Sequence, residues 1–340
     1  MSERRRILVV GPSWVGDMVM AQSLFITLQQ QAEVQIDVLA PAWSLPILQR
    51  MPQVHRGIAM PLGHGQLGLR TRWQLGRQLA RTGYQQAIVL PGSLKSALVP
   101  WFAGIPQRTG FTGEQRYGLL NDRRPLDKQA LPMTVQRFVA LGLPRAAAAS
   151  NAPEFRPPRL VADAANATRM RERLGLHDPR PAVAFMPGAE YGPAKQWPAS
   201  HFAQLARELM ARGQQVWVLG SAKDREMGQA IANLLPPEHA QQLHMLCGQT
   251  ELGDVVDLLS LCAGAVSNDS GLMHIAAALG IPLVAIYGSS DPRHTPPLSP
   301  AARALSLNLP CAPCFERRCP LGHTRCLNEL LPEKVLQALP

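Results

Sequence analysis

Short apolar runs alternate with longer segments of helical periodicity from one end of the chain to the other. The runs are rich in Val, Ile, Leu and Ala, whereas the intervening segments repeat apolar residues every three to four positions. This alternation predicts βα units, in which parallel strands form a sheet with helices on both faces. The clearest strand candidates are 7–10, 36–39, 87–90, 182–186, 215–219, 264–267 and 283–287. The sequence therefore favours an α/β fold built on parallel sheets.

One expected helix follows the strand candidate 182–186. Ser200 is its predicted N-cap, and Gly213 is predicted to end it. Between them, apolar residues recur at helical spacing: Phe202, Leu205, Ala206, Leu209 and Met210. One stripe of this helix should therefore pack on a sheet.

The chain is long enough for two domains of ordinary size. Residues 144–158 contain four consecutive alanines and several prolines without a clear period, which is typical of a linker. We therefore expect two domains, residues 1–160 and 161–340. Because open α/β sheets bind ligands at the carboxyl edges of their strands, the two sheets are expected to face each other across a ligand-binding cleft.

Charge is distributed unevenly between the two halves. The formal net charge is +10, and residues 1–165 hold 19 Lys and Arg against 9 Asp and Glu, whereas the remainder holds 15 of each. An anionic substrate or surface is therefore expected to meet the N-terminal half. Aromatic residues make up only 5% of the chain, and no RNA-binding or zinc-finger signature is present, so nucleic-acid binding is disfavoured.

No membrane-spanning segment is expected. The apolar run after the basic N-terminus covers only residues 7–10, which is too short for a signal peptide. No other segment approaches the roughly 18 apolar residues that a transmembrane helix needs. The expected location is cytoplasmic, and any membrane contact would be peripheral.

The loop after the first strand candidate, residues 11–18, has the sequence GPSWVGDM. Its glycine spacing mimics a Walker loop, but Asp17 stands where that loop carries a lysine, and a carboxylate would repel a nucleoside triphosphate. The Rossmann dinucleotide fingerprint is also absent. Because Asp17 lies at a helix start, where backbone N–H groups favour a negative charge, it is a candidate general base. Simple helix capping is the alternative.

A second loop, residues 187–198, has the sequence PGAEYGPAKQWP and follows the strand candidate 182–186. Its backbone, beginning at Gly188, and the point charge of Lys195 could bind a phosphate. The alternative is an exposed lysine in a turn. Glu190 is not expected in such a site, since a carboxylate beside a phosphate is unfavourable.

A third loop, residues 267–274, has the sequence SNDSGLMH and precedes a helix. Asp269 or Ser270 could cap that helix, and Gly271 would let an oxygen atom approach free backbone N–H groups. His274 lies about one turn further on. It could bond a phosphate or sugar oxygen, or it could pack on the sheet.

The six cysteines fall into two groups. Cys247 and Cys262 lie in apolar contexts and are predicted core thiols. The others lie close together in sequence: Cys311, Cys314, Cys319 and Cys326. The CxxC pair and His323 are compatible with a structural zinc ion, but the second pair is irregularly spaced. Reduced thiols in a tight loop are the alternative, and disulfides are disfavoured in a cytosolic chain.

Together, the segment WVGDMV at residues 14–19 and the loops 187–198 and 267–274 resemble the bacterial ADP-heptose:lipopolysaccharide heptosyltransferases. The match follows the expected order along nearly the whole chain, and the cysteine-rich segment is most similar to the heptosyltransferase II branch. The resemblance implies a GT-B glycosyltransferase with two Rossmann-like domains. The N-terminal domain would bind the acceptor and the C-terminal domain the sugar nucleotide.

The resemblance also implies an inverting reaction. Asp17 would take the proton from an acceptor heptose hydroxyl as that oxygen attacks the anomeric carbon of ADP-heptose. The residues implied to bind the donor and its departing diphosphate are Gly188, Lys195, Asp269, Ser270, Gly271 and His274. No metal ion or other cofactor is expected, since the chain has no Asp-x-Asp pair of the kind that holds Mg²⁺.

The implied acceptor is the phosphorylated, carboxylate-rich inner core of heptosyl-Kdo₂-lipid A at the cytoplasmic membrane face, which agrees with the basic N-terminal half. Lys95, Arg108 and Arg116 are candidate contacts for its anionic groups. Two other enzymes stay open. A heptosyltransferase I would act on Kdo₂-lipid A, and a GT-B sugar-nucleotide epimerase would have less need of a basic N-terminal half.

Overall fold

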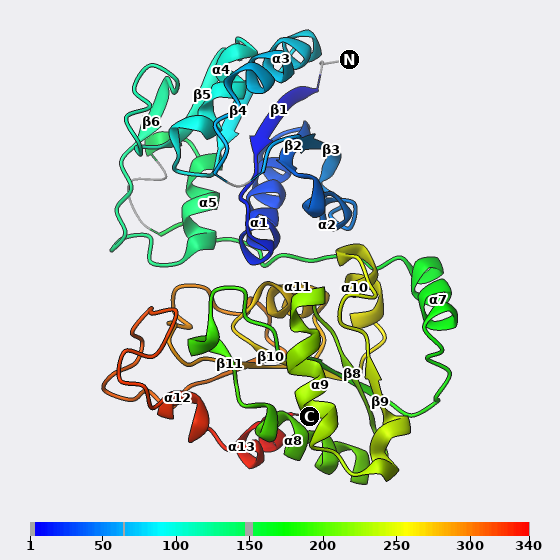
Figure 1. Ribbon diagram of the computed structural model, residues 1–340. Helices are drawn as coiled ribbons and strands as arrows, with labels where there is room; N and C mark the ends of the chain where they lie inside the picture. The colour runs from blue at the N-terminus through cyan, green and yellow to red at the C-terminus, as the bar shows by residue number, and fades with distance from the viewer. Residues whose placement is uncertain (1–3, 64, 147–151, 340) are drawn as a thin grey trace. The chain divides into compact units, whose positions relative to one another are not determined.

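Each half of the chain forms its own six-stranded sheet in the computed structural model (Figure 1), and every strand pair in both sheets is parallel. The structure describes residues 4–63, 65–146 and 152–339, so part of the expected linker, residues 147–151, lies outside the described residues. The chain divides into two units, Met1–Pro158 and Arg159–Pro340. The expected α/β class with two Rossmann-like domains is confirmed.

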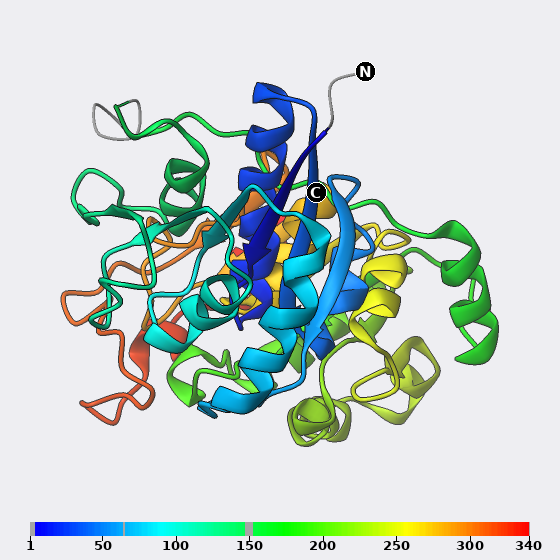
Figure 2. The same cartoon turned by 90° about the horizontal axis from the view of Figure 1, so that it is seen from above.

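The first unit has the strand order β3-β2-β1-β4-β5-β6. Its strands are β1 (Arg5–Val10), β2 (Val34–Pro41), β3 (Val54–Met60), β4 (Gln86–Val89), β5 (Gln107–Phe111) and β6 (Asp122–Arg124). Its helices are α1 (Val15–Gln31), α2 (Leu45–Leu48), α3 (Leu69–Leu79), α4 (Leu98–Phe102) and α5 (Thr134–Gly142). Figure 2 shows β1, β2 and β3 side by side, in successively lighter blue. The strand candidates of this half are confirmed as β1, β2 and β4.

The second unit has the strand order β12-β11-β10-β7-β8-β9. Its strands are β7 (Ala182–Met186), β8 (Gln215–Val218), β9 (Leu243–Met245), β10 (Gly264–Asn268), β11 (Leu283–Ile286) and β12 (Ala302–Leu305). Its helices are α7 (Ala164–Arg173), α8 (Ala199–Ala211), α9 (Arg225–Asn233), α10 (Leu252–Leu259), α11 (Gly271–Leu279), α12 (Arg325–Asn328) and α13 (Pro332–Ala338). The strand candidates here are confirmed as β7, β8, β10 and β11.

The two strand orders are the same when each unit is numbered from its own first strand. In both, the chain starts in the middle of the sheet, builds outward on one side, and then returns to build the other side. The order therefore reverses between β1 and β4 in the first unit and between β7 and β10 in the second. Ligands of open α/β sheets bind beyond the carboxyl ends of the strands at such a switch point.

Helix α8 begins earlier than the sequence predicts. Pro198 is the N-cap, and its carbonyl accepts hydrogen bonds from the N–H groups of His201 and Phe202. The first turn therefore closes on Pro198, so the prediction of Ser200 as N-cap is wrong. Gly213 ends the helix as predicted, with a φ of +77° that favours glycine.

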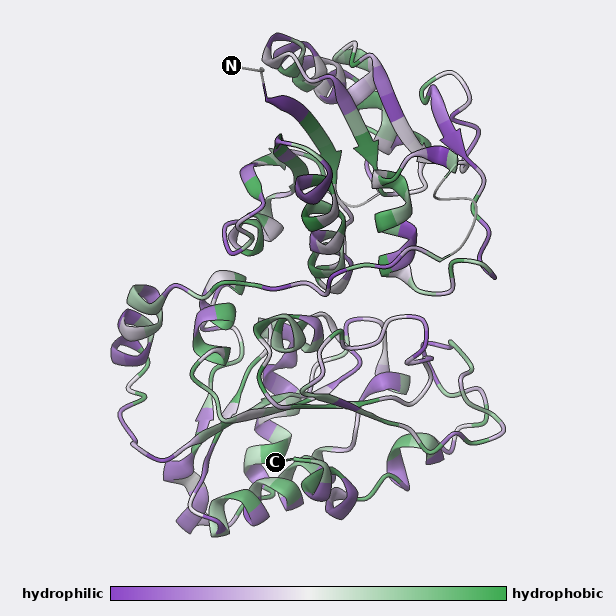
Figure 3. Ribbon diagram, turned by 180° about the vertical axis from the view of Figure 1, so that it is seen from behind, coloured by the Kyte–Doolittle hydropathy of each residue, from purple (hydrophilic) through white to green (hydrophobic). Residues whose placement is uncertain are grey.

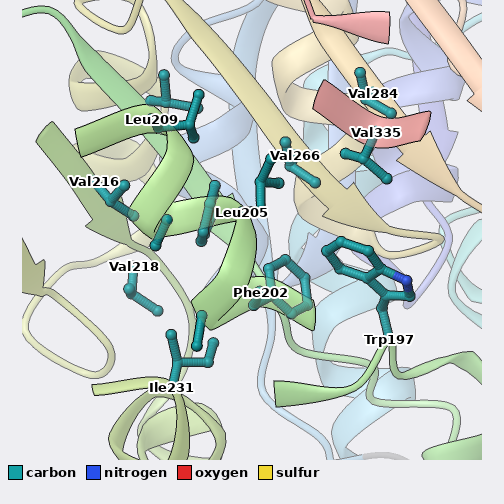
Figure 4. Packing of buried hydrophobic residues seen from close by; sticks show 14 of the residues in the cluster. Trp197, Phe202, Leu205, Leu209, Val216, Val218, Ile231, Val266, Val284 and Val335 are labelled. Atoms are coloured by element: carbon teal, nitrogen blue, oxygen red, sulfur yellow. The ribbon is translucent and has the colours of Figure 1, made fainter. Parts of the chain in front are cut away.

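The expected stripe of α8 packs in the core of the second unit. Figure 4 shows Phe202, Leu205 and Leu209 along the helix, with Trp197 beside Phe202 at a ring-centroid distance of 4.9 Å. The indole of Trp197 is fully buried and donates a hydrogen bond to the Leu330 carbonyl at 2.8 Å. Trp197 thus fixes the end of the loop 187–198 in the core.

Helices differ in how much of their surface is buried. Figure 3 shows hydrophobic residues along α1 and hydrophilic residues over much of α7. Helix α1 packs against both its sheet and α5, so its first turn is held at the carboxyl end of β1. This packing positions the loop that carries Asp17.

Candidate active site

Two predicted loops lie together at the switch point of the second unit. The loop 187–198 follows β7 and the loop 269–270 follows β10, and these strands are direct neighbours. The fully buried Asn268 joins them, because its side-chain amide donates to the Pro187 carbonyl at 2.7 Å and its side-chain oxygen accepts from the Trp197 N–H at 3.1 Å. Asn268 lies within the third motif, but nothing in its local sequence marks it as the residue that joins the two loops.

Lys195 and Asp269 form an ion pair at this point. Lys195 Nζ lies 2.5 Å from Asp269 Oδ2, and the two side chains are 18% and 6% exposed. The same carboxylate oxygen accepts a hydrogen bond from Ser290 Oγ at 2.5 Å. Lys195 Nζ also lies 5.1 Å from the centroid of the Tyr191 ring, a distance typical of a cation–π contact. The ammonium group is therefore held in one place and retains some exposure.

Helix α11 begins beside this ion pair. Ser270 is its N-cap, but no side-chain capping bond forms, since Ser270 Oγ lies 3.2 Å from Ser267 Oγ and the Asp269 carboxylate is engaged by Lys195 and Ser290. The prediction that Asp269 or Ser270 caps this helix is therefore confirmed for Ser270 as the N-cap residue, although its side chain makes no capping bond. The first-turn N–H groups, beginning at Gly271, lack intrahelical partners and carry the positive end of the helix dipole. Such a helix start is suited to bind a phosphate.

His274 lies in the first turns of α11 and is 5% exposed. Burial lowers the pKa of its imidazole to about 4; Asp269 opposes this shift and Lys195 adds to it. The ring is therefore neutral at pH 7. It can act toward an anion only as a neutral hydrogen-bond donor, not as a cation.

Gly188 and Glu190 lie on the side of the same loop that faces the turn after β8. A Cβ atom at Gly188 would lie 2.4 Å from Asp224 Oδ1, so the close approach requires glycine. The Asp224 carboxylate accepts hydrogen bonds from the backbone N–H and hydroxyl of Ser221. Glu190 forms an exposed ion pair with Lys223 at 2.6 Å. Glu190 thus pairs outside the cluster formed by Lys195 and Asp269, as expected for a carboxylate in a loop that binds phosphate.

In the first unit, Asp17 and Lys95 follow the two strands of its switch point. Asp17 is half-buried in the first turn of α1, after β1. Lys95 lies in the short 3₁₀ segment Leu94–Ala97, after β4, and β4 pairs directly with β1. The structure thus brings the candidate base and one candidate anion contact to the same edge of the same sheet.

The other two candidate acceptor contacts are occupied within the unit. Arg116 is 2% exposed and donates to the carbonyl oxygens of Pro91 and Phe111, each at 2.6 Å. Arg108 donates to the carbonyl oxygens of Leu119 and Ile105 at 2.7 and 2.5 Å. Burial lowers the pKa of both guanidinium groups. This placement does not favour direct contact with an acceptor, because an anion would have to displace these carbonyls. Arg116 instead holds the loop that carries Lys95, and Arg108 joins the start of β5 to Ile105 and Leu119.

The six cysteines fall into the two groups that the sequence predicts. Cys247 and Cys262 are buried, which confirms them as core thiols. The other four are free thiols that line one small cavity: Cys311, Cys314, Cys319 and Cys326. Within the described residues, no group of three or more His, Cys, Asp or Glu side chains is arranged to hold a metal ion.

No helix in the described part of the chain combines the length and apolar character needed to span a bilayer.

Comparison with known proteins adds independent evidence to this geometry. The chain is 48% identical over 339 residues to lipopolysaccharide heptosyltransferase 2 of Escherichia coli (strain K12), covering 98% of this chain and 97% of that protein. The solved structure of E. coli ADP-heptose lps heptosyltransferase II superimposes with a TM-score of 0.88 and 45% identity over 98% of this chain and 97% of that one. By contrast, lipopolysaccharide heptosyltransferase 1 of Pseudomonas aeruginosa is 32% identical over 173 residues, which is 49% of this chain and 46% of that protein.

The sequence profile described as glycosyltransferase family 9 (heptosyltransferase) matches residues 72–325, a range that begins in α3 and includes both loops of the second switch point. Together with the near full-length relatives, this match shows that the chain belongs to glycosyltransferase family 9, the heptosyltransferase family.

Proposed function

We propose that this protein transfers L-glycero-D-manno-heptose from ADP-heptose to the heptose of heptosyl-Kdo₂-lipid A, with inversion at the anomeric carbon. The observation that carries the proposal is the Lys195–Asp269 pair beside the start of α11, at the switch point of the second unit. A held ammonium group and free helix N–H groups suit the diphosphate of a sugar nucleotide. Four relatives named heptosyltransferase 2 are 44–48% identical over 88–98% of the chain, whereas the type 1 relative is 32% identical over 49%, which favours the type II acceptor.

The reaction is one in-line displacement. The acceptor hydroxyl oxygen forms a bond to the anomeric carbon while the bond from that carbon to the donor's diphosphate oxygen breaks. Asp17 takes the hydroxyl proton as the new bond forms. Asp17 suits this role because it lies in the first turn of α1, at the carboxyl edge of the sheet. There the positive end of the helix dipole favours a carboxylate.

The leaving group is ADP, on which negative charge builds as the bond breaks. Lys195 supplies a positive charge, and the N–H groups at Ser270 and Gly271 supply oriented donors. Asp269 holds Lys195 until the diphosphate arrives and orients the loop toward the donor sugar. His274 contributes only a neutral hydrogen bond, since its pKa is about 4. Gly188 allows the loop to pass close to Asp224 beside the donor.

The acceptor is held by the first unit. That unit contains the entire excess of positive charge, and Lys95 lies on the same sheet edge as Asp17. A phosphorylated, carboxylate-rich acceptor embedded in the inner membrane would attract this unit to the cytoplasmic membrane surface. We therefore propose a cytoplasmic protein that associates peripherally with that membrane.

The test is ADP release from ADP-heptose in EDTA, with and without heptosyl-Kdo₂-lipid A. We expect release only with the acceptor, and a loss of about 10²- to 10⁴-fold for Asp17→Asn because the base is removed. Glu33→Gln is the matched control, since it removes the same charge from an exposed residue just beyond the opposite end of α1. Its rate should equal that of the wild type.

Four results would decide against this proposal or a part of it. Unchanged release by Asp17→Asn would remove that residue from the catalytic site. No acceptor-dependent release by the wild type, even after Mg²⁺ is added, would reject the transferase activity. Conversion of the sugar nucleotide without any release of ADP would favour the epimerase. Faster release with Kdo₂-lipid A than with its heptosylated form would instead favour heptosyltransferase I.

A further inference from the structure

The cysteine-rich segment between β12 and α12 contacts the Lys195 loop through its backbone. The Ala194 N–H donates to the Arg317 carbonyl at 3.1 Å, and the Tyr191 hydroxyl donates to the Phe315 carbonyl at 2.6 Å. A Cβ atom at Gly192 would lie 2.5 Å from that Arg317 oxygen, and the φ of Gly192 is +153°. The contact is therefore closer than any other residue at position 192 would allow.

The same segment is also tied to the other side of the Lys195–Asp269 pair. Phe315 has a φ of +58°, and its N–H donates to the Ser289 carbonyl at 2.7 Å. Ser289 directly precedes Ser290, whose hydroxyl binds Asp269. Phe315 thus contacts both sides of the site. Its N–H bonds to Ser289, next to the residue that binds Asp269, and its carbonyl oxygen accepts the hydrogen bond from Tyr191.

This arrangement places a second cation near Lys195. The guanidinium carbon of Arg317 lies 5.3 Å from the centroid of the Tyr191 ring, and Lys195 Nζ lies 5.1 Å from the same centroid. The Arg317 guanidinium carbon and Lys195 Nζ are therefore separated by no more than these two ring distances added together. One diphosphate that accepts a hydrogen bond of about 2.8 Å at either end can span such a gap.

Lys195 is paired with Asp269, whereas Arg317 lies at the surface. Its side chain is exposed, and in the described part of the chain no carboxylate forms an ion pair with it. A guanidinium group also suits this position because its planar fork bonds two phosphate oxygens at once and stacks on an aromatic ring. The ring of Tyr191 limits the positions that this long side chain takes, so less entropy is lost on binding.

We propose that Arg317 is a second binding residue for the diphosphate of the sugar-nucleotide donor, positioned beside Lys195 by the ring of Tyr191. This inference rests on the proposed function, because it assumes that the donor diphosphate lies at Lys195. It assigns a role to the cysteine-rich segment: the segment carries Arg317 to the donor site.

The experiment is calorimetric titration of the full-length protein with ADP, and competition by adenosine, which lacks phosphate. The variants are Arg317→Ala, Lys195→Ala and Arg318→Ala, the last being an exposed neighbour that removes the same charge. We expect Arg317→Ala to weaken ADP binding about five- to tenfold, as for a partly exposed charge-assisted hydrogen bond. Adenosine binding and the melting temperature should not change, and Arg318→Ala should behave as the wild type.

Each other outcome has a defined meaning. Equal ADP affinities of Arg317→Ala and Arg318→Ala would overturn the inference. An equal loss for ADP and adenosine in Arg317→Ala would also overturn it, because the residue would then act through the shape of the loop. If Lys195→Ala weakens ADP binding and Arg317→Ala does not, the donor site stands and only this inference fails. If neither variant changes ADP binding, the donor site of the proposed function fails as well.

Discussion

The Lys195–Asp269 pair has two roles that a pair of variants can separate. In the folded protein it neutralises a carboxylate that is only 6% exposed, and in the proposed reaction its ammonium binds the donor diphosphate. Lys195→Met removes both contributions while keeping an unbranched side chain. Among the described residues, the Asp269 carboxylate then keeps the hydrogen bond from the Ser290 hydroxyl. Leaving a buried charge without its partner costs about 3 to 5 kcal/mol, and because Lys195 is 18% exposed we expect about 3 kcal/mol.

The double variant Lys195→Met/Asp269→Asn removes both charges. Its stability should lie within about 1 kcal/mol of the wild type, since a pair replaced by neutral side chains is often close to neutral in stability. Urea unfolding measures both variants, followed by the fluorescence of Trp197 and Trp217, which are buried in this unit. An unchanged slope of the free energy of unfolding against urea concentration would show that both variants unfold to the same extent as the wild type.

The two variants should differ in stability but not in their affinity for ADP. Both lack the Lys195 ammonium, so both should bind ADP about 10- to 100-fold more weakly than the wild type, the range expected for a hydrogen bond to a charged group. Equal stabilities of the single and double variants would refute the energetic coupling of the pair. Wild-type ADP affinity in the double variant would refute the donor contact of Lys195.

Two further predictions concern titrating groups. The pKa of His274 is about 4 in the folded protein against an ordinary 6.5, so the unfolded chain binds more protons between these pH values. The free energy of unfolding should therefore fall by up to about 3 kcal/mol as the pH drops from 6.5 to 4, and then level off. His274→Gln should lack this decrease in urea unfolding at the same pH values. Burial raises the pKa of Cys247 and Cys262 to about 12, whereas hydrogen bonds from backbone N–H groups, chiefly that of Thr324, lower the pKa of Cys319. Mass spectrometry after iodoacetamide treatment at pH 8 should therefore find Cys319 modified first, and rapid native labelling of Cys262 would contradict its burial.

The strands that the sequence predicts are those in the middle of each sheet. They are buried on both faces and read as apolar runs, as in β7, where every residue is buried. The strands β3, β5, β6, β9 and β12 were missed. Strand β6 explains why, because its sequence is Asp-Arg-Arg and its pairing depends on distant partners. Arg124 pairs there with Asp122, two positions earlier, and donates to the carbonyl of Ala140, a contact that a local pattern does not reveal.

In the site too, features that depend on local sequence could be predicted, whereas contacts between residues distant in sequence could not. The three loops could be predicted because a strand followed by Gly and a helix start is a local signal, and parallel strands bring such loops to one edge. The pairing of Lys195 with Asp269 joins residues 74 positions apart and has no sequence signal. Arg116 looks like an ordinary surface cation in sequence, and only the fold shows that it binds the carbonyls of the loop that carries Lys95.

Corresponding positions at the switch points of the two units carry opposite charges. In the first unit a carboxylate, Asp17, follows the first strand, and a lysine, Lys95, follows the fourth. In the second unit the lysine, Lys195, follows the first strand and the carboxylate, Asp269, follows the fourth. Each edge thus carries one carboxylate and one lysine, and the strands that they follow are exchanged between the two units. In the proposed reaction, the carboxylate of the first unit removes a proton, and the lysine of the second unit stabilises the negative charge that builds on the leaving group.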